Sequence, residues 1–180
     1  MFPCRKLLTF VLFRIKLCFV RFRTIQGGDS LNADTKKYAH YSALLDQCNK
    51  ELDELYHRYA LRHNLSDATL WILYAVYTEG NAVTQADICN TWFFSRQTIN
   101  TALKGLEQQR IIELTSISGN RKSKQIAFTP SGRIAAQEIL TPLLRAEHRV
   151  FAAFRDEENE MFLELSQKRC ALLRKFLETE

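Results

Sequence analysis

Apolar residues between positions 38 and 62 recur at the spacing of one helix face. The positions, separated alternately by four and three residues, are Tyr41, Leu45, Cys48, Leu52, Leu55 and Tyr59. This heptad spacing predicts a long helix with an apolar seam. The seam either packs against the core of a single chain or joins a second helix, and this segment alone leaves both interpretations open.

Three shorter helices are predicted next, and each begins in the same way. An apolar residue precedes a hydroxyl residue that can cap the helix, and a second apolar residue follows four positions after the cap. The three capping residues are Ser66, Thr84 and Ser95. Gly80 is placed to end the first helix. Because the second helix is short and a tight turn separates it from the third, these two predict a helix-turn-helix.

The third of these helices has one apolar side and one side without carboxylates. The apolar side, at the spacing of a single helix face, consists of Ile99, Ala102, Leu103 and Leu106. The opposite side carries Gln97, Asn100, Thr101, Lys104 and Gln108. Amides and hydroxyls hydrogen-bond base edges in a major groove, whereas carboxylates would repel the phosphates. A neutral solvent-exposed helix explains this stretch equally well when it is taken alone.

A basic β-hairpin is predicted after this helix. Ile111–Ile117 and Gln125–Thr129 have the composition of strands, and Ser118-Gly119-Asn120 is typical of a turn. Near the tip lie Arg121, Lys122 and Lys124. Residues 81–130 contain six basic and three acidic residues. Beside a helix-turn-helix, a basic hairpin predicts a wing that contacts the DNA backbone or enters the minor groove.

The remainder of the chain is predicted to be helical. Thr129 and Pro130 are a cap and a first-turn proline, and this helix extends towards residue 154. Pro142 predicts a kink or a break in it. A final helix begins with Asp156-Glu157-Glu158, and its apolar face comprises Phe162, Leu165, Leu172, Leu173 and Phe176. A small winged core cannot bury apolar faces at both ends of the chain, so a homodimer is expected.

Residues 1–30 differ in composition from the rest of the chain. They hold six of the 25 basic and one of the 20 acidic residues, so residues 31–180 contain 19 of each and the formal charge of +5 comes from this leader. Arg14 and Lys16 interrupt its apolar run and no small-residue cleavage site follows, which argues against a signal peptide. No uncharged run approaches the about 18 residues of a membrane span. A segment lying on a membrane surface remains an alternative.

We expect the leader to be non-native, with translation starting at Leu31. Gln26-Gly27-Gly28-Asp29 can be encoded by a strong ribosome-binding sequence at a suitable distance from Leu31. If residues 1–30 are translated, their composition predicts a disordered basic-apolar segment. The intact mass of the native protein distinguishes the two hypotheses.

The region from Leu65 to Gly132 resembles the MarR family of bacterial transcriptional regulators, and the flanking helices extend the likeness over about 31–180. The matching segments are LSDATLWILYAV, VTQADICNTW, SRQTINTALKGLEQQRII and NRKSKQIAFTPSG. Three places depart from the family pattern. Asn120 replaces the acid that precedes the wing arginine, Phe128 replaces a leucine, and Gln109-Arg110 lies where many members have Lys-Gly.

The resemblance implies a mainly α fold with a small β-hairpin wing, that is, a winged helix-turn-helix core flanked by dimerisation helices. Residues 31–62 would form the N-terminal dimerisation helix, 63–132 the DNA-binding domain and 133–180 the C-terminal dimerisation helices. The protein would be a cytoplasmic homodimeric repressor that binds a near-palindromic operator in double-stranded DNA. A small lipophilic or aromatic ligand would release it. No cofactor, catalytic residue or stable membrane association is implied.

The resemblance also assigns DNA contacts to particular residues. On the recognition helix these are Ser95, Arg96, Gln97, Thr98, Asn100, Thr101 and Lys104. On the wing they are Asn120, Arg121, Lys122 and Lys124. Ser95 and Thr98 are expected to contact phosphates or cap the helix, and the amides are expected to read bases.

Other functions remain as alternatives. No nucleophile–base pair indicates an enzyme, and the cysteines and histidines lack metal-ligand spacing. A thiol sensor needs an exposed, low-pKa cysteine, whereas Cys48 and Cys89 are expected to be buried and Cys170 has no distinctive context. The aromatic residues Trp71, Tyr74, Tyr77 and Trp92 are expected to be core rather than ligand contacts. Two alternatives remain: a winged helix that binds another protein instead of DNA, and a regulator that senses oxidants through a thiol.

Overall fold

The computed structural model describes residues 33–80, 83–117 and 120–179, except for the side chains of residues 33, 117 and 120–123. The predicted leader, residues 1–30, lies outside the described residues. Within the described ranges the chain forms six helices and a two-stranded antiparallel hairpin. In chain order they are α1 (Ala33–Arg62), α2 (Asp67–Glu79), α3 (Gln85–Trp92), α4 (Arg96–Gln108), β1 (Ile112–Ile117), β2 (Asn120–Phe128), α5 (Pro130–Ala152) and α6 (Asp156–Thr179). The predicted fold class is confirmed.

The four predicted helix starts after α1 are formed as expected. Ser66, Thr84 and Ser95 each accept a hydrogen bond from the backbone N–H three residues later, at 3.1, 3.2 and 3.1 Å. Thr84 and Asp87 complete a reciprocal capping box. Thr129 caps α5, and Gly80 ends α2 at φ +77°. These local hydrogen bonds fix the residue at which each of α2, α3 and α4 begins.

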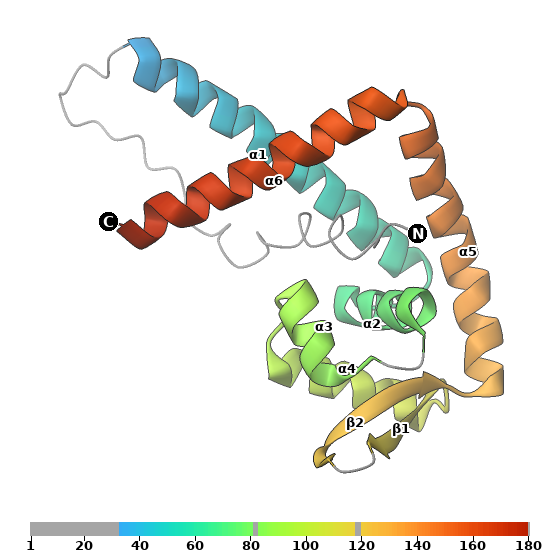
Figure 1. The fold of residues 1–180 in the computed structure, drawn as a ribbon. Helices are drawn as coiled ribbons and strands as arrows, with labels where there is room; N and C mark the ends of the chain where they lie inside the picture. Colours follow the sequence, from blue (N-terminus) through green and yellow to red (C-terminus); the bar gives the residue numbers. More distant parts are fainter. Residues whose placement is uncertain (1–32, 81–82, 118–119, 180) are drawn as a thin grey trace.

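The core is built around α2. Every residue from Leu70 to Val76 is buried, because α3, α4, the hairpin and α5 enclose this helix (Figure 1). The indole rings of Trp71 and Trp92 stack with their centroids 4.5 Å apart. The prediction that the aromatic residues belong to the core is confirmed for Trp71, Tyr74 and Trp92, which are at most 4% exposed, whereas Tyr77 is partly buried against the core. We call α2–β2, residues 67–128, the winged module.

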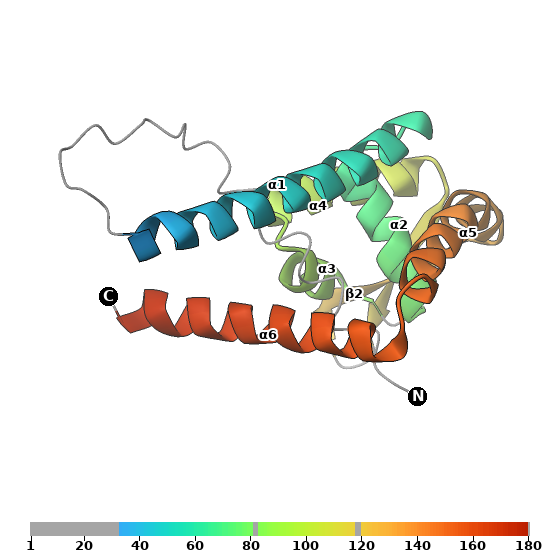
Figure 2. The ribbon, with the colours of Figure 1, turned by 90° about the horizontal axis from the view of Figure 1, so that it is seen from above.

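Helices α1 and α6, which we call the arm helices, extend away from the winged module. They cross in Figure 1, but the view from above in Figure 2 shows a space between them. Their apolar faces are exposed in the single chain: Tyr41, Leu45, Leu52 and Leu55 of the α1 seam are 42–51% exposed. The interpretation that this seam packs against the core of one chain is therefore wrong for these positions.

Three local predictions need correction. Cys48 is exposed rather than buried, because α1 reaches the core only towards its C-terminal end. Pro142 does not break α5, which continues from Pro130 to Ala152.

β2 begins at Asn120 rather than Gln125, so Arg121, Lys122 and Lys124 lie on the strand itself. Pairing with β1 continues beyond Gln125, through Ser116 with Lys124 and, after an irregularity, Ile117 with Asn120.

Candidate nucleic-acid interface

The recognition helix predicted from the sequence is α4. Ile99, Leu103 and Leu106 are at most 3% exposed and fix the inner side of the helix in the core. The predicted contact residues Arg96, Gln97, Thr98, Asn100, Thr101 and Lys104 are all exposed. Glu107, the carboxylate of this helix, is also exposed and follows Asn100 by seven residues, so the two lie on nearly the same side of the helix. Negative charge is therefore absent around Gln97, Thr101 and Lys104 but present at the edge that carries Asn100.

Several hydroxyl groups on α4 are already committed to hydrogen bonds within the chain. Ser95 caps the helix and its hydroxyl lies 2.6 Å from that of Thr98. Thr101 Oγ1 donates its proton to the backbone carbonyl of Gln97 at 3.0 Å. With that proton engaged, the Thr101 oxygen can only accept a hydrogen bond from a base, which matches the amino groups of adenine or cytosine. The free amide groups of Gln97 and Asn100 can both donate and accept.

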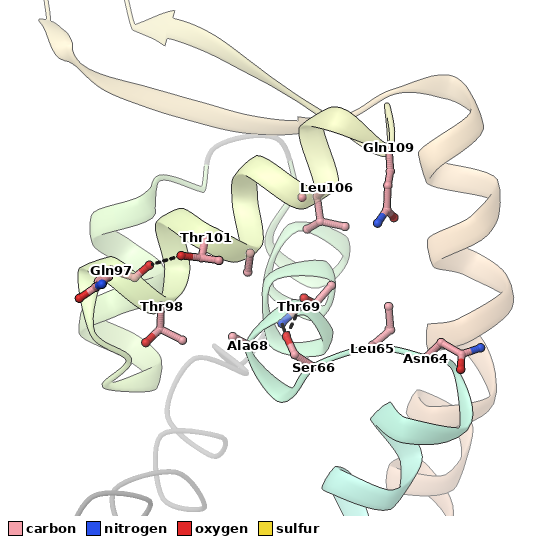
Figure 3. A pocket seen from close by; sticks show the side chains of 12 residues that line it. Asn64, Leu65, Ser66, Ala68, Thr69, Gln97, Thr98, Thr101, Leu106 and Gln109 are labelled. Atoms are coloured by element: carbon pink, nitrogen blue, oxygen red, sulfur yellow. Dashed lines mark hydrogen bonds between the residues drawn. The ribbon is translucent and has the colours of Figure 1, made fainter.

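A groove runs between α4 and the start of α2 (Figure 3). One wall consists of α4 residues from Gln97 to Gln109, and the other of residues in the segment 64–69. Both walls present amides, hydroxyls and small apolar groups, and no charged residue lines the groove. The sequence did not reveal the second wall. Ser66 was recognised only as a helix cap and Thr69 was not singled out, because nothing local indicates that they face α4.

The hairpin is attached to the winged module by main-chain hydrogen bonds. The Ile126 N–H donates to the carbonyl of Val83 at 2.8 Å, and Thr84 forms a bridge with Gln125. These bonds fix β2 beside the start of α3. Lys124 is exposed two residues before Ile126 on this strand. Asn120, Arg121 and Lys122 belong to β2, but their side chains lie outside the described part of the structure.

Arg110 connects α4 to β1 in a left-handed backbone conformation, with φ +57°. Its N–H donates to Glu107 O at 2.9 Å, and the next N–H, of Ile111, donates to Leu106 O at 2.9 Å. These bonds close the end of the helix in a turn that glycine adopts most readily. The family pattern of Lys-Gly at Gln109-Arg110 thus has a physical reason.

Arg110→Gly is expected to stabilise the fold by about 0.5–1 kcal/mol, because relief of left-handed strain exceeds the extra freedom of glycine in the unfolded chain. The free energy of unfolding from urea titration measures this change. Gln109→Gly is the matched control, since Gln109 has an ordinary φ of −78° and its replacement should destabilise the fold. Equal losses of stability in both variants would contradict strain at Arg110.

Three titratable groups interact where α1 meets the start of α2. His57 Nδ1 is 2.9 Å from Asp67 Oδ1, and the hydrogen bond and charge of Asp67 raise the pKa of His57. Burial raises the pKa of Asp53 to about 6, with a further contribution from Asp67. Protonation of His57 offsets the charge of Asp67, so this region becomes less negative as pH falls through the His57 pKa.

The surroundings of Cys89 argue against a reactive thiol at that position. Burial raises the pKa of the Cys89 thiol, although the nearby Arg96 guanidinium lowers it. A raised pKa disfavours the thiolate that an oxidation sensor requires. Among the residues that the structure describes, no three His, Cys, Asp or Glu side chains come together as metal ligands, and no helix is long and apolar enough to cross a membrane.

Residues 63–123, which contain α2 to α4 and most of the hairpin, match the sequence profile of the MarR family. The similarity to the MarR family therefore covers this part of the chain. The match agrees with the resemblance noted for Leu65–Gly132, and it is a match to transcriptional regulators rather than enzymes. No curated protein sequence is similar enough to the chain to count as a match.

Solved structures of transcription regulators share the fold over about three quarters of this chain. Staphylococcus aureus MepR in its DNA-binding conformation has 20% sequence identity and a TM-score of 0.65, covering 74% of this chain and 98% of MepR. NMB1585, a MarR family regulator from Neisseria meningitidis, has 23% identity and a TM-score of 0.62, covering 76% and 99%. The S. aureus MepR–DNA complex has 20% identity and a TM-score of 0.60, covering 74% and 97%. At these identities the likeness establishes the fold.

Proposed function

We propose that the protein is a homodimeric, sequence-specific DNA-binding transcription regulator of the MarR type. It acts as a repressor, and binding of a small lipophilic or aromatic ligand releases it from DNA. One observation carries the DNA-binding proposal: the exposed outward side of α4 has amides, hydroxyls and Lys104, with its carboxylate, Glu107, at one edge, beside an uncharged groove and a basic wing. That S. aureus MepR, with the same fold, has been solved in complex with DNA also supports the proposal.

The dimensions of α4 suit a major groove. A helix with its side chains is about 10–12 Å wide, and the major groove of B-DNA is about 12 Å wide. With α4 inserted, Gln97 and Asn100 reach base edges and Lys104 reaches a guanine or a phosphate. The basic residues of β2 then lie along the sugar-phosphate backbone, where their contacts depend on charge and carry no base preference.

The proposal predicts different effects for wing and recognition-helix substitutions. Arg121→Ala and Lys124→Ala should weaken binding to all duplexes and reduce the slope of log affinity against log salt by about 1 each. Gln97→Ala and Asn100→Ala should instead reduce discrimination between bases by about 1–3 kcal/mol per lost bidentate contact. Fluorescence anisotropy with a selected duplex and a random duplex, over a range of salt, measures both effects.

Lys168→Ala is a matched control, because Lys168 is an exposed basic residue on α6, far along the chain from the winged module. It should leave both the affinity and the salt slope unchanged. A salt slope near zero for the unmodified protein would favour a protein-binding winged helix instead. If both classes of variant lose equal affinity on selected and random duplexes, the assignment of Gln97 and Asn100 as base readers is wrong.

A further inference from the structure

One carboxylate joins three helices where the winged module meets the arms. Glu147, in the second half of α5, accepts a hydrogen bond from Tyr56 of α1 on Oε1 and another from Tyr74 of α2 on Oε2. Both O–O distances are 2.8 Å. Each carboxylate oxygen thus has its own phenol donor, and hydrogen bonds to an ionised acceptor are stronger than neutral ones.

Ring packing holds both phenols in place. Tyr74 is 4% exposed, and its ring centroid lies 5.5 Å from that of Trp71. Tyr56 packs on the same indole at 5.0 Å. Burial, together with the charge and hydrogen bond of Glu147, raises the pKa of Tyr56 and keeps its hydroxyl protonated as a donor. Ring packing therefore fixes the positions of both phenol oxygens independently of Glu147. The Glu147 carboxylate can accept both hydrogen bonds only from one position.

The two phenols come from different parts of the fold. Tyr74 belongs to the winged module, whereas Tyr56 belongs to an arm helix, and α5 connects the module to α6 (Figure 1). A second hydrogen bond, from Tyr59 Oη to the carbonyl of Ile139 at 2.6 Å, also ties α1 to α5. Elsewhere α2 packs on α5 through apolar side chains such as Leu140 and Leu143. Apolar contacts have little directionality, whereas hydrogen bonds fix an orientation.

We propose that Glu147 is a positioning residue that sets the orientation of the winged module on the arms, and thereby the separation of the two α4 helices in the dimer. The inference rests on the proposed function and extends it to the spacing of the two DNA half-sites. Successive major grooves on one face of a duplex are about 34 Å apart. Because α4 lies beyond α2 from this joint, a small rotation about the joint displaces α4 from its groove.

The test compares Glu147→Gln and Tyr74→Phe with the unmodified protein. A glutamine has the shape of glutamate, but its NH2 group cannot accept the second phenol proton. The probe is the tightest-binding duplex that the unmodified protein selects from a random library. Versions of it carry one or two base pairs inserted or deleted between the half-sites, and a further duplex carries a single half-site. Tyr77→Phe, which removes a hydroxyl from the same helix α2, is the control.

Both variants should remain dimeric and helical, and their affinity for the single half-site should stay within about twofold of the unmodified protein. On the selected duplex they should bind about tenfold more weakly, and their preference for the native spacing should flatten. A preserved spacing preference, or an equal loss on the half-site and full duplexes, would overturn the inference while leaving DNA binding intact. If the unmodified protein selects no duplex, the proposed function fails and the inference fails with it.

Discussion

Gly132→Ala is expected to lower the free energy of unfolding by about 3–5 kcal/mol, a loss large enough to unfold much of the protein at 37 °C. A Cβ at this position would lie 1.8 Å from the carbonyl oxygen of Ile111 and 2.6 Å from its carbonyl carbon. Both are backbone atoms, so no side-chain rotation can relieve the overlap. Either α5 must move away from the base of the hairpin or β1 must shift.

Both movements cost free energy, because hydrogen bonds join the same segments. The Thr129 N–H donates to the Ile111 carbonyl at 3.1 Å, and Thr129 Oγ1 donates to the Arg110 carbonyl at 2.6 Å. Thr129 Oγ1 also accepts the Gly132 N–H at 3.0 Å and so caps α5. Displacing α5 would strain or break these bonds together. The glycine three residues after the threonine, at the end of the matching segment NRKSKQIAFTPSG, is therefore required by the close approach of α5 to the residue that precedes β1.

Thermal unfolding followed by circular dichroism measures the effect, with Gly105→Ala as the matched control. Gly105 lies inside α4, and nothing lies within 4 Å of a Cβ added there. Alanine in a helix interior is favoured over glycine by about 1 kcal/mol, so this variant should be more stable than the unmodified protein. Unchanged stability of Gly132→Ala would contradict the contact between α5 and Ile111.

Local patterns along the chain predicted most of the fold. The caps at Ser66, Thr84 and Ser95 are formed by residues three positions apart, so the sequence itself contains both partners of each bond. The outward side of α4 follows in the same way from helical spacing. The end of the hairpin was less predictable, because residues 120–124 are polar in sequence and the backbone pairing of Lys124 and Asn120 with β1 is not revealed by composition.

The features that depend on distant residues were not predictable. Glu147 is 91 residues from Tyr56 and 73 from Tyr74, and in sequence it is one of several charged residues on α5. The groove wall near Ser66 likewise faces α4 only because of how α2 packs. Cys48 lies on an apolar seam, which indicates burial, but the single chain offers no partner surface at that level of α1 among the described residues. The homodimer expected from this seam stays a prediction, because the seam itself does not show where a partner would lie.

Leu165→Asp is expected to convert a dimer into folded monomers and to weaken binding to a duplex with two half-sites at least 100-fold. Leu165 is 56% exposed on α6, and its neighbours at the same face, Phe162 and Phe176, are 62% and 56% exposed. The side chain contributes nothing to the core of the single chain, so the substitution should leave the winged module folded. A charge in a closely packed apolar interface is strongly unfavourable unless it is paired.

Sedimentation velocity at micromolar concentration measures the association, and anisotropy with one-site and two-site duplexes measures binding. Gln167→Asp is the matched control, because it adds the same charge at an exposed position two residues along α6, on the opposite side of the helix from Leu165. The control should stay dimeric. A dimer that persists in Leu165→Asp would exclude this face of α6 from the interface. Two DNA-binding modules held in one molecule bind a two-site duplex more tightly than separate modules do. Monomers that bind this duplex as tightly as the unmodified protein would therefore show that the two modules do not act together.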